Sequence, residues 1–276
     1  MSAHRNARAR DNGTGDLGTA AVGSGAAGTG AVVRAAFRAE TSRFLTLPWT
    51  WIVLAAAAAL VDTAAVFADA EVGVAGIAAR DAEALPDTFG LSWSIQVFVV
   101  LAAVVAGADL RAGEPVNGML AVPDRRILAM ARTTVLVGAA VVAGLPLLAL
   151  DRGIRHAVSV SGAGPEGAAE LLRMGAGYLL SLVAFVLLAT ALTHLLRHAM
   201  AALAILLLTP FLVVPLLGRL APWAAEVLPH NASAAAVTGG GQDGLALTAG
   251  QGFAVLLAWS VVLAAVYTLV FVRRDH

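Results

Sequence analysis

The chain has 276 residues, of which 59% are hydrophobic and 13% are charged, and its mean hydropathy is +0.82. Soluble domains are about 45–50% apolar and about 25% charged, so this composition excludes an ordinary soluble globule and favours lipid as the solvent. Eighteen basic and eighteen acidic residues leave no net charge, which argues against a nucleic-acid partner, and the lack of cysteine excludes disulfides and thiol chemistry.

Residues 1–30 are rich in Gly, Ala, Ser and Arg and contain almost no large apolar side chain. Such a segment buries too little apolar surface to offset the entropy of ordering it, so we expect a disordered tail. No apolar run follows the first arginines closely enough for a signal peptide. Residues 31–276 are expected to form a single transmembrane domain.

The first ordered element is expected to be a short amphipathic helix over 33–45. Arg34 and Arg38 fall on one face, while Phe37 and Phe44 fall on the other. This pattern predicts a helix that lies on the membrane surface ahead of the first span. It either braces the spans against a soluble partner or serves as a topological anchor.

Six apolar runs follow, each close to the roughly 20 residues that a helix needs to cross a bilayer. They cover residues 47–67, 89–108, 133–150, 174–196, 199–218 and 251–272. None alternates like a barrel strand, so the sequence predicts an all-α polytopic membrane protein, a bundle of six spans. Asp62 lies inside the first run, where an ionisable group marks a translocation path or a dimer seam, unless it snorkels to the interface.

Orientation follows from the arginines, which supply every basic side chain because Lys is absent. With the N-terminus inside, thirteen arginines fall on the cytoplasmic side and five on the other. The positive-inside rule therefore predicts both termini in the cytoplasm. The abundance of Ala, Gly and Val and the exclusive use of Arg are typical of a GC-rich bacterial genome, so a bacterial plasma membrane is expected.

Two connections carry polar residues of interest. The connection over 108–132 has mixed charges and turn-forming Gly and Pro, which predict a helix, a turn and a second helix under the membrane; an ordinary loop fits as well. Where the fourth run meets the fifth, His194 and His198 stand four residues apart, so they would share a helical face and could hold a metal. A positively charged hinge is the favoured interpretation of that turn.

The order of these features resembles the permease of type-2 ATP-binding-cassette transporters, in particular bacterial exporters whose permease and ATPase are separate chains. In the connection after the second run, the residues on that pattern are Asp109, Arg111, Gly113, Leu120, Pro123, Arg125 and Arg126. Leu228-Pro229 and the terminal arginines also resemble the family, and the resemblance covers roughly 32–276. The chain departs from it at Glu114, where the family usually has Thr, and at Arg132, where it usually has Lys.

The resemblance implies that 109–126 is a coupling element that docks on an ATPase subunit. The implied coupling residues are Asp109, Arg111, Gly113, Glu114, Met119, Leu120, Pro123, Arg125 and Arg126. The sequence has no phosphate-binding G-x-x-x-x-G-K-[ST] motif, so we expect the chain not to be an enzyme, with ATP and Mg bound by the partner ATPase.

The resemblance also implies a second permease copy or a paralogue, and export as the direction. The apolar spans favour a hydrophobic or amphipathic small molecule as cargo. Two other classes stay open: a membrane sensor or assembly subunit that transports nothing, and a membrane-embedded enzyme that modifies lipids.

Overall fold

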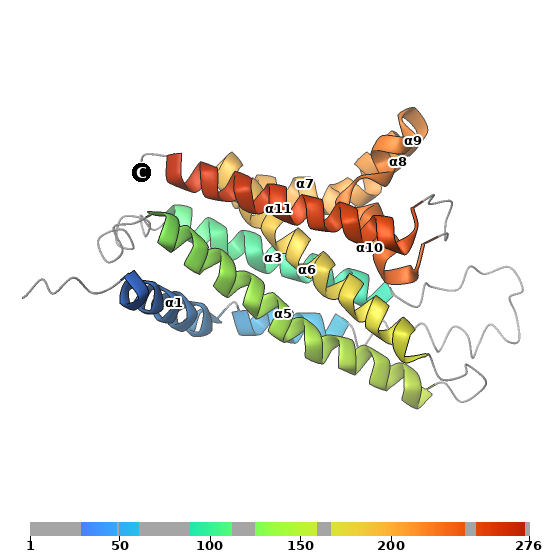
Figure 1. Ribbon diagram of the computed structural model, residues 1–276, viewed down its shortest axis with the longest axis horizontal. Coiled ribbons are helices and arrows are strands. Elements are labelled where there is room, and N and C mark those ends of the chain that lie inside the picture. Colours follow the sequence, from blue (N-terminus) through green and yellow to red (C-terminus); the bar gives the residue numbers. More distant parts are fainter. Residues whose placement is uncertain are drawn as a thin grey trace, which may run out of the picture.

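The computed structural model describes residues 29–48, 50–60, 89–111, 125–158, 167–240 and 247–273, and within them the fold is all-α. The elements are α1 (Thr29–Thr46), α3 (Phe89–Arg111), α5 (Arg125–Val158), α6 (Ala168–Leu196), α7 (Ala199–Leu208), η1 (Thr209–Val213), α8 (Val214–Leu220), α9 (Pro222–Glu226), α10 (Pro229–Thr238) and α11 (Ala249–Arg273) (Figure 1). A further helix, Thr50–Leu60, follows α1. In these ranges the only strand-like pairing is one bridge between Gly240 and Thr248.

Among the described residues, five helical segments are long and apolar enough to cross a membrane. They are Leu91–Ala108, Arg126–Ile154, Ala168–Leu196, Ala199–Leu220 and Ala249–Arg273. The pair Gly30–Thr46 and Thr50–Leu60 passes the same test together, bent by 63°, which makes up to six. The predicted all-α polytopic fold is therefore confirmed.

Two of these helices extend well beyond the predicted runs. The run 133–150 lies inside α5, which continues through Asp151 and Arg152, and the run 174–196 lies inside α6, which begins at Ala168. Asp151 is fully buried and its Oδ2 lies 2.7 Å from a guanidinium nitrogen of Arg152. Hydropathy falls at such charged residues, but a helix continues through them when their charges are paired.

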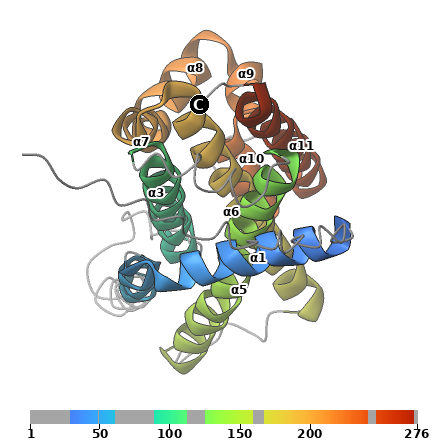
Figure 2. The ribbon, with the colours of Figure 1, turned by 90° about the vertical axis from the view of Figure 1, so that its left-hand side faces the viewer.

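The central element of the bundle is α6, which contacts α3, α5, α7, α10 and α11 (Figure 2). Tyr178 and Leu182 on α6 are fully buried. The Tyr178 hydroxyl lies 2.7 Å from Oγ of Ser94 on α3, and Oγ of Ser233 on α10 donates to Oγ of Ser181 at 2.7 Å. These paired hydroxyls satisfy polar groups that would otherwise be costly to bury.

The fifth predicted run is a single apolar stretch with an irregular turn. Between α7 and α8 the chain forms the π-helical segment η1, with Pro210 in its first turn. Proline lacks an N–H donor, and a proline inside a helix is one of the established causes of kinks. Thr209 Oγ1 donates to the carbonyl of Ile205 at 2.6 Å next to this site. Pro146, in contrast, lies within an unbroken α5.

The chain after α8 returns into the bundle as α10, a helix that the sequence did not predict. Two glycines allow α10 to pack between α6 and α11. A Cβ on Gly177 of α6 would lie 2.7 Å from the carbonyl oxygen of Ala236, and one on Gly252 of α11 would lie 2.7 Å from that of Ala232. Gly239, at φ 96°, ends α10 in the left-handed conformation that glycine adopts readily.

Candidate functional site

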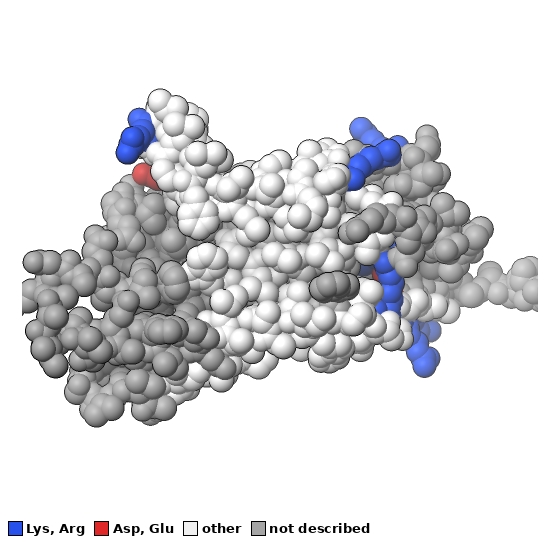
Figure 3. Space-filling model, turned by 180° about the vertical axis from the view of Figure 1, so that it is seen from behind, with Lys and Arg blue, Asp and Glu red and all other residues white. Residues whose placement is uncertain are grey.

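The described charged side chains gather towards the two ends of the bundle (Figure 3). One end carries α1, the start of α5 and the last turns of α6 and α11, and we call it the arginine-rich end. Its described arginines are Arg34, Arg38, Arg43, Arg126, Arg132, Arg197 and Arg273. The described arginines towards the opposite end are Arg152, Arg173 and Arg219. An apolar band between charged ends is the arrangement expected of a protein that spans a bilayer.

A fixed elbow joins α1 to the helix Thr50–Leu60. The residue before Pro48 is non-helical, as the ring of a following proline favours, so α1 ends at Thr46. The last carbonyls of a helix have no partner within it. Here Thr50 Oγ1 donates to the carbonyl of Phe44 at 2.9 Å, and Trp51 Nε1 donates to that of Leu45 at 3.0 Å. Side chains beyond the elbow thus hold the end of α1.

We expect Thr50→Val to loosen this elbow. Thr50 is 1% exposed, so the substitution keeps the shape but leaves the Phe44 carbonyl without its donor in a buried place. The expected loss is about 1–2 kcal/mol in the free energy of unfolding, measured in detergent. Thr46→Val is the matched control, because the Thr46 hydroxyl donates to Arg43 at an exposed position. Equal losses in the two variants would contradict this role for Thr50.

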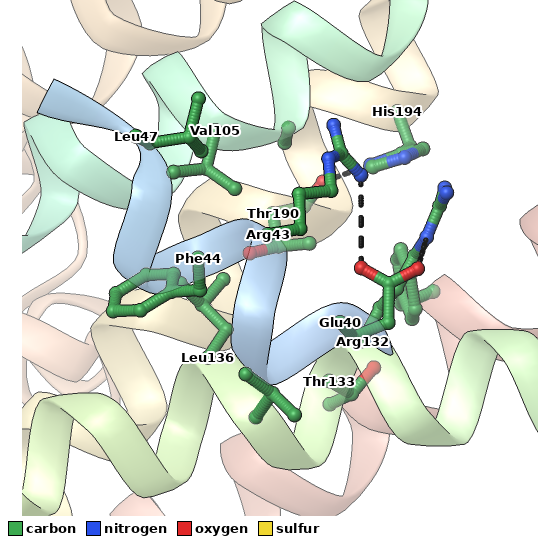
Figure 4. A pocket seen from close by; sticks show the side chains of 13 residues that line it. Glu40, Arg43, Phe44, Leu47, Val105, Arg132, Thr133, Leu136, Thr190 and His194 are labelled. Carbon is green, nitrogen blue, oxygen red and sulfur yellow. Dashed lines mark hydrogen bonds and ion pairs between the residues drawn. The ribbon is translucent and has the colours of Figure 1, made fainter. Parts of the chain in front are cut away.

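An ion pair fixes α1 to the start of α5. Nε of Arg132 donates to Oε1 of Glu40 at 2.9 Å, and Oε2 of Glu40 lies 3.6 Å from Nη1 of Arg43 (Figure 4). The side chains of Glu40 and Arg132 are only 13% and 9% exposed. The Arg132 guanidinium also lies 5.7 Å from the centre of the Phe271 ring on α11. One side chain therefore contacts α1 and α11 from a position on α5.

Aromatic rings extend this cluster to α6. His194 is buried, and its Nδ1 donates to the carbonyl of Thr190 at 2.9 Å, since a carbonyl can only accept. Its ring meets Tyr267 edge-on at 5.0 Å between centroids, and Tyr267 lies 5.8 Å from Phe271. We name Glu40, Arg132, His194, Tyr267 and Phe271 the junction cluster. It joins α1, α5, α6 and α11 at the arginine-rich end.

The structure corrects the idea that the two histidines share a helical face. Helix α6 ends at Leu196, and Arg197 turns the chain at φ 55°. His198 is exposed beyond that turn, where its Nδ1 accepts a hydrogen bond from the Ala201 N–H at 3.1 Å and caps α7. Within the described ranges, no group of three or more His, Asp or Glu side chains could hold a metal ion.

The amphipathic character predicted for the surface helix agrees with the burial along α1. Arg34 and Arg38 are exposed, Phe44 is 8% exposed, and Phe37 is half-buried against a cluster that contains Leu128. In Figure 2, α1 lies crosswise over the end of the bundle.

The predicted coupling residues are only partly described. Asp109 and Arg111 belong to the last turn of α3, Arg125 begins α5, and Arg126 is exposed on it. The other predicted coupling residues lie outside the described residues; they are Gly113, Glu114, Met119, Leu120 and Pro123. Asp62 also lies outside the described residues.

Of the junction cluster, the sequence singled out only His194, and that as a candidate metal ligand. Two signals pointed to the cluster. Glu40 falls four residues from both Ala36 and Phe44, on the buried face of an otherwise basic helix. Arg132 is one of the two positions at which the chain departs from the permease pattern that it resembles. Neither signal shows that Glu40 and Arg132 pair with each other, because the two residues are 92 positions apart in sequence.

These features define the class: an all-α polytopic membrane protein with a surface helix fixed to one end of its bundle. No protein-family model matches the chain, and no curated protein matches it.

Proposed function

We propose that the chain is the membrane-spanning permease subunit of an ATP-driven transporter, with ATP bound and hydrolysed by a separate partner. The observation that supports this most is the fixation of α1 to α5 through Glu40 and Arg132 at the arginine-rich end. In the proposed orientation that end faces the cytoplasm, where a soluble ATPase would meet it.

In this proposal, the junction cluster transmits a displacement caused by such a partner from the start of α5 to α1 and α11. Helix α5 begins at Arg125, inside the proposed coupling segment 109–126. A displacement there moves Arg132 about two turns further along the same helix, and with it Glu40 on α1 and Phe271 on α11. Packed helices pass such a displacement on because close-packed interiors are hard to compress.

The permease itself performs no covalent chemistry in this proposal. ATP-driven motion of the partner would shift the spans between two arrangements that differ in their affinity for the cargo. The resemblance further supports a second permease copy and export of a hydrophobic or amphipathic small molecule.

Co-purification tests the proposal. Each ATP-binding-cassette ATPase of the source genome is co-expressed with this chain and purified through a tag on the chain. One of them is expected to co-purify in stoichiometric amount. Arg125→Ala combined with Arg126→Ala, or a Gly-Ser replacement of residues 116–122, should reduce that binding at least tenfold.

The control is Arg219→Ala, which removes an exposed arginine at the opposite end and should leave binding unchanged. If no ATPase is retained, or if the loop variants bind as well as wild type, the permease proposal is wrong and the sensor or enzyme alternatives take its place.

A further inference from the structure

An apolar groove runs along the side of the bundle between the elbow and α5. It has a volume of about 710 Å³ and is open to the surroundings rather than enclosed. Leu54 and Ala58 form one wall, and Gly138, Val142 and Leu150 form the other. Among the described residues that line it there is no charged side chain.

The groove is longer than the hydrocarbon layer of one leaflet. Its α5 wall extends from Thr134 to Leu150, which is about 24 Å at a rise of about 1.5 Å per residue. One leaflet contributes about half of the roughly 30 Å hydrocarbon thickness of a bilayer. The groove therefore accommodates an extended acyl chain that starts at the arginine-rich end.

Two arginines of α1 lie on the same helical stripe as residues that line the groove at that end. Thr41 and Leu45 of α1 line it, and helical periodicity puts Arg34 and Arg38 on the same stripe, at spacings of four, three and four residues. Both arginines are exposed. A guanidinium pair next to the mouth of an apolar groove is complementary to a phosphate attached to a hydrocarbon chain.

We propose that this groove binds an acyl chain of an anionic phospholipid, whose phosphate is held by Arg34 and Arg38. The bound lipid fills the angle between α1, the helix Thr50–Leu60 and α5, so it stabilises the elbow. Trp51, which lines the groove and is 57% exposed, is the type of side chain that lies at the level of lipid head groups. The site does not depend on the chain being a transporter.

The test compares two lipids with identical acyl chains. The full chain, purified in detergent, is titrated with phosphatidylglycerol or phosphatidylcholine, and retained lipid is counted by native mass spectrometry while thermal unfolding is followed in parallel. Phosphatidylglycerol should be retained at one copy per chain and should raise the apparent Tm; phosphatidylcholine should do neither at the same concentration.

Two variants locate the site. Arg34→Gln combined with Arg38→Gln should weaken phosphatidylglycerol binding about thirtyfold, as expected for two surface arginines. Gly138→Trp should block the acyl chain and abolish retention, since a Cβ at Gly138 meets nothing within 4 Å and a ring there enters the groove. Arg273→Gln, at the same end, and Gly218→Trp, at another open glycine, are the matched controls and should bind as wild type.

Equal retention of the two lipids would overturn the head-group assignment. Unchanged phosphatidylglycerol binding in Gly138→Trp would overturn the assignment of the acyl chain to the groove. If the wild type is a dimer and Gly138→Trp alone makes it a monomer, a second copy of the chain fills the groove and the lipid proposal is wrong.

Discussion

Replacing Arg132 by Gln is expected to lower the free energy of unfolding by about 2–3 kcal/mol. The substitution leaves the carboxylate of Glu40 beside apolar packing, with Arg43 as its other ion-pair partner at 3.6 Å. Breaking a fully buried pair costs roughly 3–5 kcal/mol, and the smaller value follows from the 13% and 9% exposure of these two side chains. The measurement is denaturant-induced unfolding in detergent, followed by circular dichroism.

Two further variants make this expectation specific. Arg43→Gln removes the longer, more exposed contact to the same carboxylate and should cost less than about 1 kcal/mol. The loss of unfolding free energy in Arg132→Lys should lie between those of Arg43→Gln and Arg132→Gln. Lysine keeps the charge but lacks the planar group that lies over Phe271. If Arg43→Gln destabilises as much as Arg132→Gln, the junction cluster is not what fixes α1.

The glycines that flank α10 give the second large expected effect. Gly177→Ala and Gly252→Ala should each lower the free energy of unfolding by about 1–3 kcal/mol, since the new methyl would lie 2.7 Å from a backbone oxygen of α10. Backbone cannot rotate away as a flexible side chain can, so α10 has to move. Apparent Tm in detergent reports the loss.

Gly250→Ala is the control for this pair. It lies two residues before Gly252 on the same helix, but its Cβ would meet nothing within 4 Å. Alanine there should be neutral or stabilise by up to about 1 kcal/mol, because it reduces the conformational entropy of the unfolded chain. A loss in Gly250→Ala as large as in Gly252→Ala would show that helix packing against α10 is not the cause.

The sequence was sufficient to predict the all-α fold. Long apolar stretches without strand-like alternation must pair their backbone N–H and C=O groups in lipid, and a helix does so within one segment. The predicted sixth span begins within two residues of the first residue of α11, because hydropathy changes sharply there. The C-terminal end of α5 was missed because a buried Asp151 paired with Arg152 continues the helix where hydropathy falls. Helix α10 was missed because a ten-residue helix rich in alanine is too short to look like a span.

The site was harder to predict than the fold. Burial varies along α1 with the helical period that the sequence indicated, and Arg34 and Arg38 are exposed. The junction cluster was not predicted, since it joins Glu40 to residues of α5, α6 and α11 that no local pattern connects. The groove was likewise not predicted, because it forms only where the elbow places the helix Thr50–Leu60 beside α5.

The central claim is that the junction cluster carries motion from an ATP-hydrolysing partner into the bundle. The most direct measurement is ATP turnover by the co-purified partner, with the complex reconstituted in lipid, comparing wild type with Glu40→Gln and Arg132→Gln at a temperature where all three are folded. We predict that both variants still bind the partner but lose the change in turnover that the wild-type chain produces. Turnover that responds identically in all three complexes would contradict the claim.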